Sequence, residues 1–175
     1  MASLITLLGI IAVAAVFWQE RSAGISPAPT LPQMARMMME QCPVQVQGDI
    51  LELGCGWGGL ALKLAAKYPQ NNVIGYEMSW VPYLVSSLRE KIYVGHNLKI
   101  VRGNFYDVPF NNAGLVMCYL SPQHMVKLEE KFLRELPTGA QVISSTFYCP
   151  TWTPIRTQDV KRLVNSKIFV YEKNV

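Results

Sequence analysis

Apolar positions divide the chain into one continuous run at the N-terminus and a series of short segments further on. Residues 1–18 contain no charged side chain, and residues 4–18 are apolar except for Thr6 and Gly9. A helix of that length spans roughly 27 Å, close to the hydrocarbon thickness of a bilayer. A cleaved signal peptide would need a basic n-region, which is absent here, and a buried core helix is usually shorter. We therefore expect residues 1–19 to form a transmembrane anchor.

A proline-rich stretch separates this run from the rest of the chain. Residues 22–32 (SAGISPAPTLP) contain three prolines among small residues, a composition typical of a linker. Pro32 can start a helix, in which Met34, Met37 and Met38 recur at i, i+3 and i+4 and form one apolar face. Residues 20–47 are thus predicted to be a linker followed by a capping helix.

From residue 48 onward, apolar strand segments alternate with amphipathic helix segments. Strands are predicted at 49–53, 73–76, 98–101, 114–119 and 140–147, and helices at 60–67, 82–93 and 123–136. This alternation predicts an α/β domain over 48–175, with a mostly parallel sheet covered on both faces. The tail at 167–171 (KIFVY) is predicted to be a last, antiparallel edge strand.

Charge and cysteine content exclude several classes of protein. The chain has 16 Lys and Arg against 12 Asp and Glu, a net charge of +4, and no basic run, which argues against nucleic acid as a partner. The four cysteines form no Cys-x-x-Cys pair and lie near no paired histidines, so we expect reduced thiols rather than a metal site or disulfides. Trp18 would lie at the bilayer interface, and Arg21 and Arg36 follow the apolar run. The positive-inside rule then places the domain on the cytoplasmic side of the membrane, or its organellar equivalent.

A glycine-rich turn after the first predicted strand carries the strongest chemical signal. Residues 52–59 read ELGCGWGG, between a strand and a helix. Glycines there let the chain bend sharply and bring backbone N–H groups close to a ligand. Gly54-x-Gly56-x-x-Gly59 formally fits the dinucleotide fingerprint, so a nicotinamide-dependent oxidoreductase is one interpretation.

Two acidic residues end the first two strands. Glu52 precedes the glycine turn, and Glu77 follows 25 residues later at the end of the second strand. Carboxylates at the ends of adjacent parallel strands can face one crevice, where a ligand with an amine and a diol would satisfy both. A solvated strand-end glutamate is the alternative for each.

Further candidate site residues follow the later strands. Asn104 and Phe105 come after the third strand, with Asp107 as an alternative to Asn104. Residues 116–122 (VMCYLSP) lie at the carboxyl end of the fourth strand, where open α/β sheets gather reacting groups. Residues 145–154 (STFYCPTWTP) form an aromatic, proline-rich loop suited to a pocket wall.

These motifs together resemble one family. The ELGCGWG turn, GYEM at 75–78, YLSP at 119–122 and FYCPTW at 147–152 are similar to the small, membrane-anchored, class I (seven-β-strand) protein-lysine methyltransferases that act on the ADP/ATP carrier and the ATP-synthase c-subunit. The likeness runs from the N-terminal segment to about Pro154. The chain differs from the family at Asn104, where an aspartate is expected, and at Ser121-Pro122, which replaces a shorter apolar-Pro turn.

The resemblance implies a Rossmann-like methyltransferase sheet and S-adenosylmethionine as the cofactor. The residues it assigns to cofactor binding are Glu52, Gly54, Cys55, Gly56, Glu77, Met78, Asn104 and Phe105. Asn104 would accept from the adenine amine, and Phe105 would pack on the ring. Thr30 and Pro32 would cover the open side of the cofactor. Tyr119, Pro122, Phe147 and Trp152 would form the catalytic channel that admits the methyl acceptor.

The implied reaction is displacement at the sulfonium methyl by a neutral lysine amine of a membrane-associated protein, with no metal. Tyr119 would orient the amine, and the sequence indicates no dedicated general base. His124, at the start of a predicted helix, is more often a capping or surface residue. A methyltransferase for a membrane quinone or lipid head group, and a non-catalytic binding module, are the further alternatives.

Overall fold

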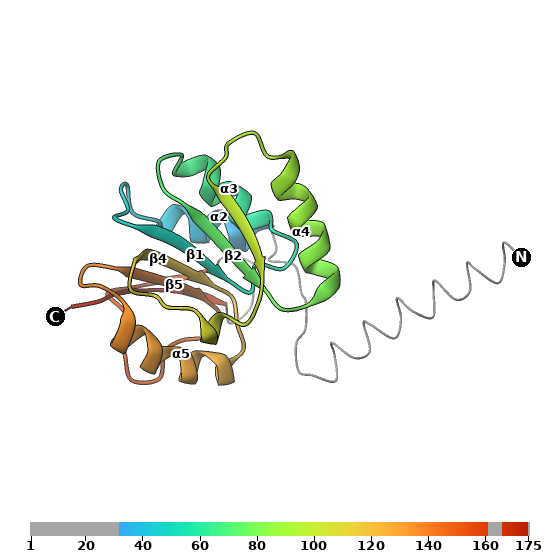
Figure 1. Cartoon of the computed structure of the whole chain (residues 1–175). Coiled ribbons are helices and arrows are strands. Elements are labelled where there is room, and N and C mark those ends of the chain that lie inside the picture. The colour runs from blue at the N-terminus through green and yellow to red at the C-terminus, as the bar shows by residue number, and fades with distance from the viewer. Residues whose placement is uncertain (1–31, 161–165, 175) are drawn as a thin grey trace, which may run out of the picture.

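A computed structural model describes residues 32–160 and 166–174 of the chain, which form a sheet with helices on both faces (Figure 1). The strands are β1 (Asp49–Leu53), β2 (Val73–Glu77), β3 (Leu98–Arg102), β4 (Ala113–Cys118), β5 (Gln141–Ser145), β6 (Arg156–Asp159) and β7 (Lys167–Glu172). The α-helices are α2 (Pro32–Gln41), α3 (Gly59–Lys67), α4 (Trp80–Ile92) and α5 (Pro122–Glu135), and η1 (Phe105–Asp107) is a short 3₁₀ helix.

The strand order is β3-β2-β1-β4-β5-β7-β6, with β1 to β5 parallel. The α/β architecture and the mostly parallel sheet are therefore confirmed. The last predicted strand is antiparallel as expected, but its edge position was wrong, because β7 pairs with β5 on one side and with β6 on the other. β6 reads RTQD and has no apolar residue, so it carries no strand signal of its own; backbone pairing with β7 forms it.

The helices divide between the two faces of the sheet. Met34 and Met38 of α2 and Leu60 and Leu64 of α3 are buried against one face, while α5 packs on the other. Met37 is half-buried beside them, so the methionine stripe contributes to packing as predicted. Because β1 to β5 are parallel, their carboxyl ends all lie along the same side of the sheet, and the candidate residues follow these ends.

The expected membrane anchor cannot be compared with this fold. Residues 1–19, the linker up to residue 31 and Thr30 within it lie outside the described residues. In the part of the chain that is described, no helix is long and apolar enough to cross a bilayer.

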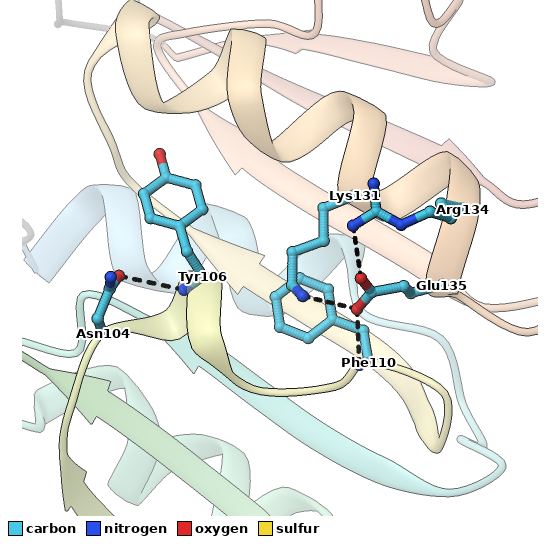
Figure 2. A network of polar contacts seen from close by, with 6 residues as sticks. All are labelled: Asn104, Tyr106, Phe110, Lys131, Arg134 and Glu135. Carbon is cyan, nitrogen blue, oxygen red and sulfur yellow. Dashed lines mark hydrogen bonds and ion pairs between the residues drawn. The ribbon is translucent and has the colours of Figure 1, made fainter.

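An ion-pair network joins α5 to the loop after η1 (Figure 2). Glu135 accepts from Lys131 Nζ and Arg134 Nη2, each at 2.7 Å, and from the Phe110 backbone N–H at 3.3 Å. The Lys131 ammonium also lies 4.7 Å from the centre of the Phe110 ring. Burial raises the pKa of Glu135, but the hydrogen bonds from Lys131 and Arg134 outweigh it and hold the pKa below its ordinary 4.5. The carboxylate thus stabilises the fold above pH 4.5, and this contribution is lost as the pH falls through the lowered value.

Glu135→Gln is expected to lower the free energy of unfolding by about 1–2 kcal/mol at neutral pH, because Lys131 loses its buried counter-charge. Urea denaturation at neutral pH and again well below pH 4.5 measures this, since protonated wild-type protein should lose the same advantage. Glu130→Gln, an exposed position on the same helix, is the matched control and should change little. An equal loss at both pH values would contradict the assignment.

Candidate active site

A cavity of about 650 Å³ opens at the carboxyl ends of the parallel strands. All eight residues predicted to bind a cofactor line it: Glu52, Gly54, Cys55, Gly56, Glu77, Met78, Asn104 and Phe105. Tyr119 and Pro32 also contribute to the lining. Its volume lies within the range of small-molecule sites.

The glycine turn between β1 and α3 presents its backbone to this cavity. The N–H groups of Gly54 and Cys55 both donate to the Tyr76 carbonyl at 2.9 Å, which ties the turn to the end of β2. Gly56 has φ +52°, and apart from its own atoms and those of Cys55 and Trp57, no heavy atom of the described residues lies within 4 Å of where a Cβ would be. The open space at Gly56 therefore allows a ligand to approach the main chain directly.

Glu77 fixes the geometry of the turn from β2. Its Oε2 accepts from the Gly56 N–H and its Oε1 from the Ser79 N–H, each at 2.8 Å. The side chain is buried, and each carboxylate oxygen has a second lone pair for a ligand donor. One residue thus connects the glycine turn, the start of α4 and the cavity.

Glu52 has an unused acceptor inside the cavity. The residue is 4 % exposed, and its Oε2 has no hydrogen-bond partner among the described residues. Burial raises the pKa of Glu52 well above its ordinary value, and the nearby negative charge of Glu77 adds to this. An unpartnered buried carboxyl is costly, so this site favours a ligand that brings a hydrogen-bond donor with positive charge. The amine and diol inferred from the sequence match these two carboxylates.

The segment around η1 forms another wall of the cavity. Asn104 caps η1, with its Oδ1 accepting from the Tyr106 N–H at 3.2 Å (Figure 2), so one of its two oxygen lone pairs is occupied. Phe105 is half-buried, and its ring centre lies 5.9 Å from that of His124. An amide beside an aromatic face suits a heteroaromatic base.

A histidine–tyrosine pair, assigned no role from the sequence, completes this wall. The Tyr106 hydroxyl and His124 Nδ1 are 2.8 Å apart, and both residues line the cavity. Burial lowers the pKa of His124 below its ordinary 6.5, and Lys127 adds to the effect. The imidazole is therefore neutral at pH 7 and adds no positive charge to the site.

Three of the four residues expected to form the acceptor channel lie elsewhere. Pro122 is exposed as the first residue of α5, and Phe147 packs at the core on the α5 face of the sheet. The Trp152 ring lies 5.0 Å from that of Tyr171 and 6.4 Å from that of Phe132. These three residues are therefore not among the lining residues of the described cavity, because the loop after β5 packs Phe147 and Trp152 against the core on the α5 face. Their role in an acceptor channel stays a prediction. Tyr119 remains at the cavity.

Sequence reasoning assigned no role in the site to several other lining residues, among them Trp57, Lys63, Arg89, Tyr106 and Leu120. Lys63 lies four residues after Gly59 on α3, so helical spacing could have indicated it. Arg89 had no local signal: it donates from α4 to the Trp57 carbonyl at 2.8 Å, a contact that exists only in the folded chain.

Comparison with known proteins gives the site a chemical context. A family model described as the ANTKMT methyltransferase domain matches residues 52–156. A protein-lysine N-methyltransferase of Saccharolobus islandicus is 27% identical over 148 residues, which cover 82% of this chain and 90% of that protein.

Two mammalian proteins are 32% identical over 111 residues. They are the human lysine N-methyltransferase of the ATP-synthase c-subunit and the mouse adenine nucleotide translocase lysine N-methyltransferase. The match covers 62% of this chain but 46% and 47% of theirs, so the chain spans about half the length of these relatives.

Solved structures share the fold at low identity. An RNA methyltransferase from Salinibacter ruber, in complex with S-adenosyl-L-homocysteine, superposes with a TM-score of 0.72 at 21% identity, over 84% of this chain and 94% of that one. TrmN from Thermus thermophilus gives 0.63 at 15% identity, over 80% and 48%. The antiparallel β7 between β5 and β6 also distinguishes this sheet from the dinucleotide-binding order 3-2-1-4-5-6.

Proposed function

The chain belongs to the ANTKMT methyltransferase domain family, and from this premise we propose that it methylates a lysine side chain of a membrane-associated protein with S-adenosylmethionine as the methyl donor. The observation that carries the proposal is the buried, unpartnered Glu52 carboxyl, which shares one cavity with Glu77 and the glycine turn. The relatives named as protein-lysine methyltransferases support the lysine, and the apolar N-terminal sequence supports the membrane.

The lining residues fit the parts of this cofactor. Glu52 would hold the methionine amine, the backbone at Gly56 would admit the ligand, and Glu77 would accept from the ribose hydroxyls. Asn104 and Phe105 would bind the adenine. Lys63 and Arg89 bring positive charge to the same cavity, which matches the cofactor's carboxylate.

When bound, the cofactor supplies an activated sulfonium methyl group, so the protein's main task is to align donor and acceptor. Tyr119, at the end of β4, would orient the acceptor amine. The amine must arrive uncharged, and desolvation in a partly apolar cavity lowers the pKa of a lysine. The neutral His124 ring helps, because a cation there would repel the positively charged sulfonium.

Residues 1–19 are proposed to hold the domain on the cytoplasmic or equivalent organellar face of a membrane. This placement would bring membrane proteins within reach. A quinone or lipid head group is the alternative acceptor, and the lysine methyltransferases among the relatives favour the protein.

The test is to incubate the full chain with labelled S-adenosylmethionine and a membrane fraction, then locate the label by peptide mass spectrometry. We expect label on a lysine residue. Label recovered in the lipid extract instead would identify a small-molecule acceptor, and Glu77→Ala serves as the inactive control.

Phe105→Ala is expected to weaken cofactor binding about tenfold, because stacking of one base on an aromatic ring contributes roughly 1–3 kcal/mol. Phe105→Trp should retain most of the affinity, since it keeps an aromatic face. Calorimetric titration with S-adenosylhomocysteine measures both variants. If alanine and tryptophan bind equally well, Phe105 does not stack on the adenine.

A further inference from the structure

Helix α4 presents an apolar surface that no other described element covers, which we call the α4 stripe: Trp80, Leu84, Leu88 and Ile92. These residues recur every four positions, so they lie on one side of the helix, and their exposed fractions run from 55% to 74%. Val94, just after the helix, is 87% exposed. Single exposed apolar residues are common on protein surfaces, whereas a contiguous row of them indicates a contact surface.

The α4 stripe is distinct from the side of the helix that packs on the sheet. Pro82 and Ser86 are buried, and Tyr83 packs against the core, so the inner side of α4 already contacts the rest of the domain. Figure 1 shows α4 at the outer margin of the domain, with no described element over its outer side. A surface helix normally carries polar residues there.

Two cationic side chains lie beside the stripe. The Arg102 guanidinium lies 3.6 Å from the centre of the Trp80 ring, and Lys91, next to Ile92 on α4, is exposed. Glu90 is the acidic residue of α4, and its carboxylate accepts from the Ile100 N–H of β3 at 2.8 Å. The rim formed by Lys91 and Arg102 therefore carries net positive charge.

We propose that the α4 stripe and its rim form a contact face for an anionic lipid bilayer, with α4 lying in the interface plane. An apolar row with a tryptophan and flanking cations is the composition of helices that bind at membrane surfaces. A second copy of the chain fits less well, because a symmetric pair would bring the two cationic rims together. If residues 1–19 are anchored, residues 19–31 can extend at most roughly 45 Å, which leaves this face within reach of the same membrane.

The placement has a consequence for the cavity. Met78 precedes α4, Arg89 lies within it, and both line the cavity. A bilayer held against the α4 stripe would keep the cavity beside the membrane surface, where lysines of membrane proteins are exposed. This consequence rests on the proposed function, whereas the contact face itself does not.

The experiment attaches an environment-sensitive fluorophore to an engineered cysteine of the full chain, at Leu84→Cys or, as the matched control, at Lys127→Cys on α5. The four native cysteines are buried, so the label goes to the engineered one. Vesicles of phosphatidylcholine with phosphatidylglycerol should shift the emission at 84 to the blue, and brominated acyl chains should quench it. The label at 127 should respond far less, and since both chains carry the same N-terminus, the difference reports α4 alone.

Two sets of substitutions test the chemistry of the face. In Leu88→Gln with Ile92→Gln, the lipid concentration that gives half of the emission shift at 84 should rise about tenfold, because two apolar side chains no longer enter the interface. Lys91→Glu with Arg102→Glu should remove the preference for phosphatidylglycerol and the sensitivity to salt. Binding of S-adenosylhomocysteine should be unchanged in Leu88→Gln with Ile92→Gln, which shows that the variant is folded and separates this result from any failure of the proposed function.

Three outcomes would overturn the proposal. Equal responses at 84 and 127 would mean that α4 does not touch lipid. A blue shift at 84 that grows with protein concentration without vesicles would indicate a second copy. If the label at 84 already emits in the blue without vesicles, at every protein concentration, another segment of the chain covers the stripe.

Discussion

Glu77→Ala is expected to raise the dissociation constant for S-adenosylmethionine by more than about 100-fold, with a matching loss of methyl transfer. Glu77 holds the Gly56 and Ser79 N–H groups at 2.8 Å, and its free lone pairs face the same cavity. Removing Glu77 deletes the proposed ribose contacts, and each hydrogen bond to a charged group contributes roughly 1.5–3 kcal/mol. The substitution also loosens the glycine turn, because the Gly56 N–H loses its acceptor. The two losses act on one site and are expected to be more than additive.

Calorimetric titration measures the affinity, and the thermal midpoint shows whether the variant is folded. Glu172→Ala is a suitable control, because this carboxylate also lies at a strand end but binds Gln141 Nε2 at 2.9 Å on β5, away from the cavity. Wild-type affinity in Glu77→Ala would contradict the assignment of the site.

Glu52→Gln is expected to have opposite effects on the ligand-free protein and on cofactor binding. Burial raises the pKa of Glu52 above its ordinary 4.5, so the stability that its protonated form provides is complete below pH 4.5 and is lost as the pH rises through the raised value. Glutamine keeps the shape without this penalty. The ligand-free variant should therefore be more stable than wild type at neutral pH, because a neutral amide avoids the cost of burying a charge.

Binding should weaken in the same variant by about tenfold to 100-fold, because glutamine offers the methionine amine no negative charge. Thermal unfolding with and without S-adenosylmethionine, across pH 4.5 to 8, tests both effects in one series. We expect the pH dependence to be flatter in Glu52→Gln than in wild type. Glu40→Gln, an exposed position on α2, is the control. A variant that is less stable without ligand, or that binds as tightly as wild type, would exclude the proposed role.

The cofactor-binding residues of the site could be predicted from local sequence. Glu52, the glycine turn, Glu77 and Asn104 each follow a strand, and parallel strands bring such positions to one edge of the sheet whatever the details of packing. Their convergence could therefore be predicted from the order of strands and helices.

The acceptor side could not be predicted in this way. Whether Phe147 and Trp152 line the cavity or the core depends on which face the loop after β5 crosses, and local sequence does not encode that choice. Long-range contacts such as Arg89 with the Trp57 carbonyl, or His124 with Tyr106, join segments that share no motif.

By itself, the sequence determined the α/β alternation, the parallel strands β1 to β5 and the strand-end carboxylates, because side-chain periodicity and strand order fix them locally. Three features depend on tertiary contacts: β7 lies inside the sheet, Trp152 packs against the core, and no described element covers the α4 stripe. Edge pairing and the choice of face depend on which distant surfaces meet, and the pattern of residues along one segment carries no information about its future neighbour.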